Sequence, residues 1–268
     1  RFLIIDQPKV PQSPSTKSLQ FILLLGLLGG LAFGVGAVVL YDFFDNRIML
    51  PGDFEKFYPQ LPVIGSYQQK SKPEMLEIEK RNYNPTIQMT ELAEAAVNIR
   101  RKISLGKKKI FAIISPIRRE GKSFISYQLA QSLAYKNQSV LLVDMDFINP
   151  KTTLLADAGD KPGILDYITN DATLDDIVQS TEFPNLFIIG KGKHNIVKHY
   201  YYDDPKLVEF TKAIGKKFDV VLLDTPGLLF IPHALSLIDL TDGLILITRM
   251  TVTTRAALDR LLKNLGKS

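Results

Sequence analysis

Two patterns of apolar residues divide the chain. From Leu19 to Leu40 the sequence is apolar and carries no charged residue. As an α-helix this stretch would be about 33 Å long, which is enough to cross a hydrocarbon core of about 30 Å. The segment Tyr41–Phe44 that follows is bulky, whereas a signal peptide ends in small residues at its cleavage site. The pattern therefore predicts a transmembrane helix over residues 19–40.

Glycines recur on one face of this predicted helix. Gly26, Gly30 and Gly34 are four residues apart, a spacing that lets a second helix approach closely in a bilayer. The spacing favours an oligomer, although glycine is also common in transmembrane helices that make no such contact.

The second pattern begins after Lys107, where short apolar runs alternate with helical segments. The runs predicted as buried strands are Ile110–Ile114, Val140–Val143, Leu186–Ile189, Val220–Leu223 and Leu244–Thr248. The segments predicted as helices are Ser123–Tyr135, Gly163–Asn170, Leu174–Ser180, Pro205–Lys217, His233–Ile238 and Thr254–Leu265. Continuous apolar strands that alternate with helices predict an α/β fold, in which helices cover both faces of a parallel sheet.

Proline-rich segments flank the predicted span. Residues 41–88 are predicted as a linker with short ordered pieces, because prolines interrupt them repeatedly. A helix is expected from Met89 to Ser104, where apolar residues recur on one face. Phe2–Ile5 is a further strand candidate, and the three prolines at positions 8, 11 and 14 predict an extended connector.

A phosphate-binding motif lies between the first predicted strand and the helix after it. Gly121-Lys122-Ser123 opens that helix, where free backbone N–H groups and the helix dipole favour an anion. Lys122 would reach the β- and γ-phosphates of a nucleotide, and the Ser123 hydroxyl would ligate Mg²⁺. The P-loop pattern has glycine where this chain has Pro116, so the motif alone is partial.

Carboxylates follow two of the other predicted strands. Asp144 and Asp146 come just after one apolar run, and Asp224 ends another. Ligands of parallel sheets bind at the carboxyl ends of the strands, and an acid beside a phosphate loop is the usual holder of Mg²⁺. A single acid there is often only a turn residue. Two such strand ends, together with the Gly-Lys-Ser segment, predict a nucleotide site.

Composition narrows the functional classes. The chain has no Cys, which excludes a disulfide scaffold, Cys-ligated metal sites and a Cys nucleophile. Its three His are not at metal-ligand spacing. The net charge is +5, and residues 47–109, with 12 Lys/Arg and 7 Asp/Glu, match this whole excess. A basic segment after a membrane span more often faces anionic lipid or a charged partner than nucleic acid, and a solvated face is the alternative.

The run from Val140 to Asp146, V-L-L-V-D-M-D, resembles the Walker A′ element of deviant P-loop ATPases. Together with the predicted span, it makes the chain resemble the bacterial tyrosine autokinases of the polysaccharide co-polymerase (chain-length determinant) family. Other segments similar to family motifs occur in the family's order, and they are Ile4–Asp6 with its prolines, Leu61–Gly65, Glu94–Arg100, Ile114–Ser123 and Leu240–Leu246.

The resemblance implies an α/β P-loop NTPase fold of the deviant, MinD/ParA-like type, preceded by one transmembrane helix. It implies a periplasmic stub at residues 1–18, the span at 19–40, a cytoplasmic linker at 41–88 and an ATPase and tyrosine-kinase-like domain at 89–268. The protein would lie in the bacterial inner membrane with its C-terminal domain in the cytoplasm, where ATP is available. Because the family's tyrosine-rich tail and last strand are not found, we expect this chain to be a fragment, shortened at its C-terminal end.

The same resemblance implies a function. The protein would bind ATP and Mg²⁺ and phosphorylate tyrosines on neighbouring copies in a ring-like homo-oligomer. Its other partners would be the membrane and the machinery that polymerises and exports a capsular or extracellular polysaccharide, with no nucleic acid involved.

Roles for the site residues follow from the resemblance too. The nucleotide contacts expected in the loop are Arg119, Glu120, Gly121, Lys122, Ser123 and Phe124. Asp146 and Asp224 would help Ser123 to place the metal. Asp144 would be the base that accepts the proton of the attacking tyrosine hydroxyl, with Lys122 and Asp146 as the other catalytic residues.

Several positions depart from the family pattern. They are Val97, Arg118, Arg119, Phe124, Ile148 and Gly227. Arg119 stands where the family has glycine, so we expect a conformational cost or a different loop shape. The two arginines could instead neutralise phosphate charge directly. The departures leave a catalytically degenerate membrane scaffold as one alternative. A MinD/ParA-type positioning ATPase is a second, against which the integral span argues.

Overall fold

The computed structural model describes residues 19–48, 50–67, 93–106, 109–135, 137–194 and 198–266. The chain divides into two compact units, residues 1–46 and 47–268. The predicted strand at Phe2–Ile5, the proline connector after it and the part of the predicted linker from 68 to 88 lie outside the described residues.

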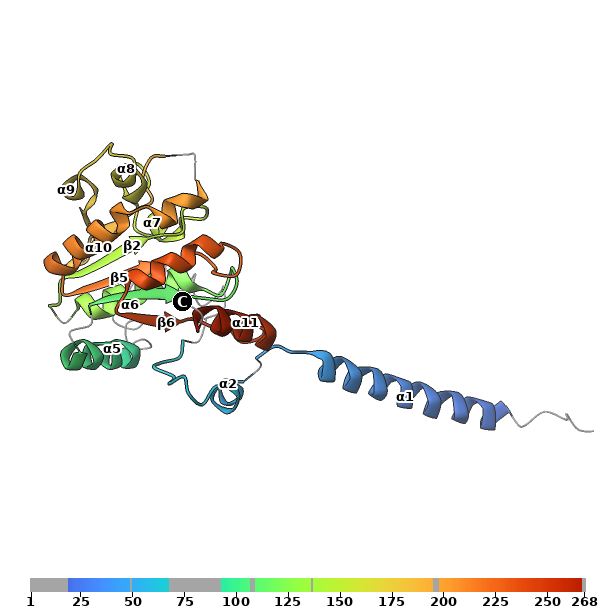
Figure 1. Ribbon diagram of the computed structural model, residues 1–268. Helices are drawn as coiled ribbons and strands as arrows, with labels where there is room; N and C mark the ends of the chain where they lie inside the picture. The colour runs from blue at the N-terminus through green and yellow to red at the C-terminus, as the bar shows by residue number, and fades with distance from the viewer. Residues whose placement is uncertain are drawn as a thin grey trace, which may run out of the picture. The chain divides into compact units, whose positions relative to one another are not determined.

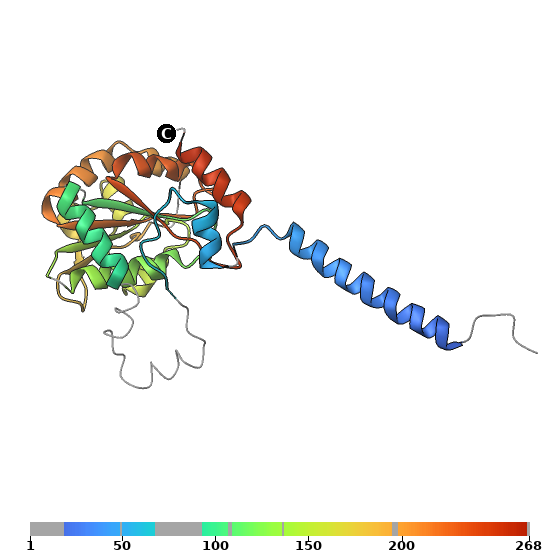
Figure 2. The same ribbon diagram turned by 90° about the horizontal axis from the view of Figure 1, so that it is seen from below.

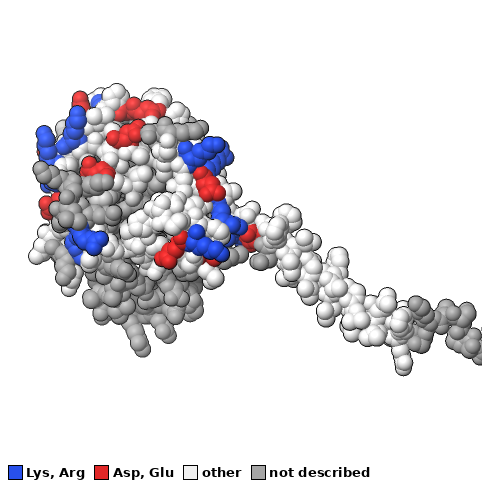
Figure 3. Space-filling model, turned by 60° about the horizontal axis from the view of Figure 1, so that its bottom comes forward, with Lys and Arg blue, Asp and Glu red and all other residues white. Residues whose placement is uncertain are grey.

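The first unit contains α1 (Leu19–Phe44). Its segment Leu19–Tyr41 has a mean hydropathy of 2.5 and is, in the part of the chain that the structure describes, the one helix long and apolar enough to cross a membrane. Its apolar side chains are exposed. In the space-filling view this helix carries almost no charge, whereas charged groups of both signs are interspersed on the visible face of the second unit (Figure 3).

The second unit is built on a six-stranded sheet with the order β3-β4-β2-β5-β1-β6 (Figure 1). The strands are β1 (Ile110–Ile114), β2 (Val140–Asp144), β3 (Gln179–Ser180), β4 (Leu186–Ile189), β5 (Val220–Asp224) and β6 (Gly243–Leu246). All pairings are parallel except that of β3 with β4. The predicted parallel sheet is therefore correct for its five longer strands, and a short antiparallel strand is added at one edge.

Helices cover both faces of this sheet, as the continuous apolar strands predict. Side chains alternate between the faces along each strand. Phe111 and Ile113 of β1 pack with α5 (Ala93–Gly106) and α6 (Lys122–Ala134) on one face. Ala112 and Ile114 belong to the core on the other face. Among the helices that contribute to that second core are α8 (Ile164–Ile168), η1 (His199–Asp203), α10 (Lys206–Lys217), η2 (Pro232–Leu240) and α11 (Arg255–Leu265).

Residues 47–67 belong to the second unit, and Ile48 and Tyr58 contact α11 and the loop before it. Ile48 exchanges backbone hydrogen bonds with Thr251 and Thr253, of 2.8 and 3.0 Å. After α2 (Pro51–Phe57), the Tyr58 hydroxyl donates a 2.8 Å hydrogen bond to Asp259. Both ribbon views show α2 beside α11 (Figures 1 and 2). This stretch, expected to be linker, therefore forms part of the surface of the second unit.

Most predicted elements are present, with four corrections. The strand expected at Leu244–Thr248 is β6, which begins one residue earlier and ends two residues earlier, at Leu246. The helix expected at Leu174–Ser180 ends at Ile177 as α9 (Leu174–Ile177), and its last two residues form β3. The helix expected at His233–Ile238 is the 3₁₀-helix η2. Two short helices, α2 and α7 (Lys151–Leu155), were not predicted, because segments of seven and five residues are too short to show a helical period.

Candidate functional site

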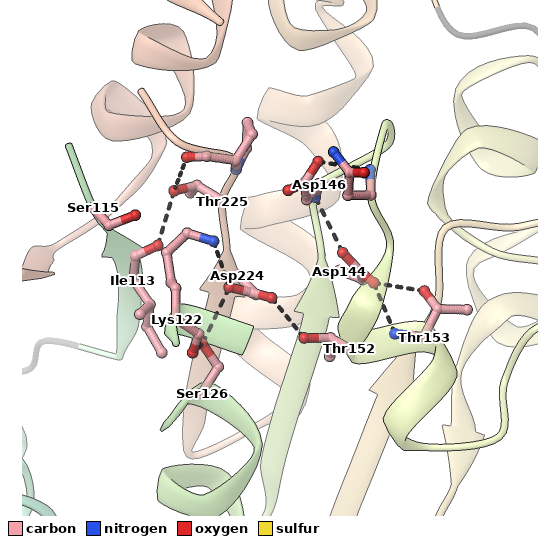
Figure 4. Close-up of polar contacts among 12 residues, drawn as sticks. Ile113, Ser115, Lys122, Ser126, Asp144, Asp146, Thr152, Thr153, Asp224 and Thr225 are labelled. Atoms are coloured by element: carbon pink, nitrogen blue, oxygen red, sulfur yellow. Dashed lines mark hydrogen bonds and ion pairs between the residues drawn. The ribbon is translucent and has the colours of Figure 1, made fainter. Parts of the chain in front are cut away.

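The carboxyl ends of the central strands bring the predicted acids together. β2 and β5 are parallel neighbours, and their register pairs Asp144 directly with Asp224. β1 lies on the other side of β5 and pairs Ile113 with Asp224. The loop that carries the Gly-Lys-Ser segment leaves β1 at this same edge. The strand order thus explains why residues far apart in sequence meet at one place (Figure 4).

The loop between β1 and α6 has two residues in the left-handed region of backbone space. Gly121, just before α6, has φ 87°, and Arg119 has φ 67°. Glycine adopts this conformation without strain, whereas a residue with a Cβ atom adopts it at a cost of about 1–2 kcal/mol. The cost expected for Arg119 is therefore present. The Arg249 guanidinium, 3.2 Å from the Arg119 carbonyl oxygen, braces this turn.

Lys122 and Asp224 form a buried ion pair. Lys122 Nζ lies 3.2 Å from Asp224 Oδ1, and the side chains are 8% and 0% exposed. Ser126 Oγ is also 3.2 Å from Oδ1, and Thr152 Oγ1 donates a 2.6 Å hydrogen bond to Oδ2. A buried charge needs such partners. The network fixes the lysine ammonium at the start of α6, where phosphate would bind (Figure 4).

Asp144 and Asp146 differ in surroundings. Asp144 Oδ2 accepts hydrogen bonds of 2.7 Å from both the amide and the hydroxyl of Thr153, and Oδ1 accepts one of 3.1 Å from the Asp146 amide. Burial, and next the charge of Asp224, raise the pKa of Asp144 to about 8. Asp146 accepts a 3.0 Å hydrogen bond from the Asn149 amide, and burial raises its pKa as well. Both acids can therefore carry a proton at a higher pH than an exposed aspartate would.

Glu120 is turned into the protein. One oxygen of its carboxyl group accepts a 3.0 Å hydrogen bond from the Ile117 amide, and the other accepts one from the Thr253 hydroxyl. Burial raises its pKa. Its side chain is therefore used in hydrogen bonds within the protein that hold the loop in place. If Glu120 contacts a nucleotide, the contact would come from its backbone.

A cavity of about 700 Å³ adjoins the phosphate loop on the β6 side of the sheet. Gly121 and Phe124 border it, together with residues from the segment 61–67 and from the end of β6. The rings of Phe124 and Tyr67 are 5.3 Å apart. Most of the lining is apolar, which suits the flat base of a nucleotide better than its phosphates.

The chemistry of these donors fits a magnesium–nucleotide complex. Lys122, the Ser123 hydroxyl and the first amides of α6 are suited to phosphate and its metal. Among the described residues, no group of three or more His, Asp or Glu side chains is arranged to hold a metal ion by itself. Mg²⁺ bound to a nucleotide needs no such cage, because phosphate oxygens and waters complete its shell around one or two carboxylates.

The structure brings together the predicted residues Lys122, Asp144, Asp146 and Asp224, with Ser123 and Phe124 on the same helix start. The partners that sequence reasoning missed are hydroxyl residues, namely Ser126, Thr152, Thr153 and Thr253. A signal existed for Ser126, which is four residues after Lys122 and therefore on the same helical face. For the threonines the sequence carries no comparable signal.

A family model described as an AAA domain matches residues 108–267. The match contains the phosphate loop and all three strand-end acids. The chain belongs to this family.

Three curated proteins are similar to parts of the chain that differ in extent. The tyrosine-protein kinase ptk of Acinetobacter johnsonii is 24% identical over 96% of this chain and 36% of its own length. The tyrosine-protein kinase CpsD of Streptococcus agalactiae serotype III (strain NEM316) is 33% identical over 53% of this chain and 62% of its own. The succinoglycan biosynthesis transport protein ExoP of Rhizobium meliloti (strain 1021) is 20% identical, and 35% of it is covered. The resemblance to bacterial tyrosine autokinases is confirmed, although this AAA-domain chain spans about a third of the length of ptk and ExoP.

Solved structures establish the fold. The BceF tyrosine kinase domain has a TM-score of 0.71 at 21% identity and covers 82% of this chain and 94% of its own. The Pyrococcus furiosus cell division ATPase MinD has a TM-score of 0.51 at 23% identity, covering 60% of this chain and 67% of its own. The predicted P-loop NTPase fold of the MinD-like type is thereby confirmed.

Proposed function

We propose that the second unit binds Mg-ATP and transfers its terminal phosphate to tyrosine, as the names of the tyrosine-protein kinase relatives suggest. The observation that carries the proposal is the buried pair of Lys122 and Asp224 at the carboxyl edge of the sheet, with Asp144 in register beside it. This arrangement places a fixed cation at a helix N-terminus and acids one strand away, which is what phosphoryl transfer requires.

The nucleotide would extend from the acids to the apolar cavity. Its phosphates would lie on the loop amides and Lys122, and its base would enter the cavity beside Phe124 and Tyr67. The Phe124 ring, which replaces the hydroxyl residue of the family pattern, would provide an apolar contact. This direction puts the terminal phosphate on the side of β5 and β2, where the acids are.

Each residue would contribute a separate part of the chemistry. Mg²⁺, when bound, would neutralise phosphate charge, and Ser123, Asp146 and Asp224 would hold it. Asp144 would accept the proton of the tyrosine hydroxyl, since a base with a pKa of about 8 is matched to reactions near neutral pH. Its two oxygens already accept hydrogen bonds from Thr153 and Asp146, but a carboxylate offers about four lone-pair sites.

The wider role is proposed from the relatives. ExoP is named a succinoglycan biosynthesis transport protein, which supports a role for this chain in exopolysaccharide chain length and export. α1 would anchor the protein in the inner membrane, with the second unit in the cytoplasm and copies assembled as an oligomer. A degenerate scaffold is the second candidate, because Arg119 places a strained, bulky residue in the loop that approaches phosphate.

The test uses the whole chain in detergent micelles. Lys122→Met should weaken Mg-ATP binding at least about tenfold, or about 1.4 kcal/mol, by isothermal titration calorimetry, while the exposed-surface variant Lys216→Met should not. Equal affinity in Lys122→Met and the parent chain would exclude the phosphate site.

Phosphotransfer is measured separately. Phosphotyrosine should form on the chain, or on an added copolymer of glutamate and tyrosine, and should be lost in Asp144→Asn while Mg-ATP still binds. A chain that binds Mg-ATP and labels neither acceptor would support the scaffold.

A further inference from the structure

Of the three consecutive tyrosines Tyr200–Tyr202, Tyr202 is the most deeply buried, and it lies next to the segment that carries Asp144 and Asp146. Its side chain is 1% exposed, whereas Tyr200 is 56% exposed. The Tyr202 ring stacks on Phe147, with centroids 4.6 Å apart and planes inclined by 9°. Phe147 directly follows Asp146, so the stack attaches η1 to the end of the segment that carries both acids.

The Tyr202 hydroxyl is buried, and no hydrogen bond of ordinary geometry joins it to another described residue. Buried tyrosine hydroxyls usually have a partner, and an exception calls for an explanation. The surrounding charges are those of the site, since Asp146, Asp144 and Arg118 all act on the phenol. The Phe147 amide lies close enough to act weakly as a donor to the hydroxyl oxygen, so what the hydroxyl lacks is an acceptor for its own proton. A tyrosine hydroxyl is protonated near neutral pH and can serve as a donor.

We propose that Tyr202 is a positioning residue for the terminal phosphate: its hydroxyl donates a hydrogen bond to a phosphate oxygen held between the loop and Asp146. This inference rests on the proposed nucleotide function. The ring is already immobilised by its stack on Phe147, so that its orientation would be set before the nucleotide binds, while the groups that cover the hydroxyl would have to move as the phosphate enters. Since only a triphosphate reaches the acids in the proposed direction, Tyr202 would distinguish ATP from ADP.

The variant Tyr202→Phe removes the hydroxyl and keeps the ring. In the whole chain in micelles, we expect Mg-ATP affinity to fall about tenfold, the usual effect of losing a hydrogen bond to a charged group. Mg-ADP affinity should stay the same. The melting temperature without nucleotide should be unchanged or higher, because a buried unpaired hydroxyl is removed. Tyr200→Phe, on the same 3₁₀-helix but exposed, is the matched control and should change neither affinity.

Each other outcome contradicts the inference. Unchanged Mg-ATP affinity with a higher melting temperature would mean that the hydroxyl is only a packing defect. Equal losses for Mg-ATP and Mg-ADP would mean a general disturbance of the site. A lower melting temperature would mean that the hydroxyl has a partner within the protein. If Lys122→Met retains Mg-ATP affinity, the proposed function itself fails, which is a different result from failure of Tyr202→Phe alone.

Discussion

Asp144 and Asp224 stand directly opposite each other on neighbouring parallel strands, and neither side chain is exposed. Two buried carboxylates at one place cannot both ionise freely. Asp224 has the ammonium of Lys122 at 3.2 Å, whereas the hydrogen bonds described here for Asp144 come from neutral donors, Thr153 and the Asp146 amide. In the ligand-free protein the pair is therefore expected to keep one proton near neutral pH, carried by Asp144, and this proton would have to leave before Asp144 could act as the base for tyrosine.

This proton makes the stability of the ligand-free protein depend on pH. The pKa of Asp144 is raised to about 8 from its ordinary value of 3.8, so the folded state binds more protons than the unfolded state between these values. Stability must then fall as pH rises through this window, by at most about 1.4 kcal/mol per pH unit for one proton. Asp144→Asn should remove this contribution. Urea unfolding of both proteins from pH 5 to 8.5 measures it, and a difference between them that does not change with pH would contradict the assignment.

Thr152 tests the network around Asp224 independently of Lys122. Its hydroxyl donates a 2.6 Å hydrogen bond to a fully buried carboxylate. Thr152→Val keeps the shape but removes the donor, and should reduce the free energy of unfolding by about 1–3 kcal/mol. Thr152→Ser, which retains a hydroxyl, should recover most of the loss. Equal unfolding curves for the valine and serine variants would show that the hydrogen bond contributes nothing.

Arg119 predicts a stabilising substitution. Its φ of 67° is in the left-handed region, so that Arg119→Gly should raise the free energy of unfolding by about 1 kcal/mol. Arg118→Gly is the matched control: Arg118 is not among the residues with positive φ, and glycine there should stabilise nothing. The melting temperatures of the two variants decide the point. A loss of stability in Arg119→Gly would mean that side-chain contacts of Arg119 outweigh its backbone strain.

Sequence reasoning located the sheet and the acids because both depend on local patterns. β1 and β4 were predicted with their observed bounds, since buried parallel strands are continuous apolar runs. Asp224 could be placed beside Asp144 because parallel strands end at one edge. The hydroxyl partners could not be found, since Thr152 and Thr153 lie on a five-residue helix without a visible period. The orientation of Tyr202 depends on its stack with Phe147, which is a contact between distant segments.

Thr253 joins the loop after β6 to the phosphate loop. Its side chain is fully buried, its hydroxyl donates to Glu120, and it accepts a 2.8 Å hydrogen bond from the Arg249 amide. Thr253→Val would remove the hydrogen-bond partner that the threonine hydroxyl provides to Glu120 and to the Arg249 amide. The free energy of unfolding should fall by about 1–3 kcal/mol. Mg-ATP binding should weaken, because the phosphate loop would be held less firmly.

A double-mutant cycle that combines Thr253→Val with Glu120→Gln isolates the contact between these two residues. Because Thr253 and Glu120 are joined directly, their effects on the free energy of unfolding should not add, and the double variant should lose less than the sum of the single losses. Thr253→Ser, which keeps the hydroxyl, is the control and should retain both stability and affinity. Strictly additive losses would show that Thr253 and Glu120 act independently, and that the loop after β6 does not support the phosphate loop through this contact.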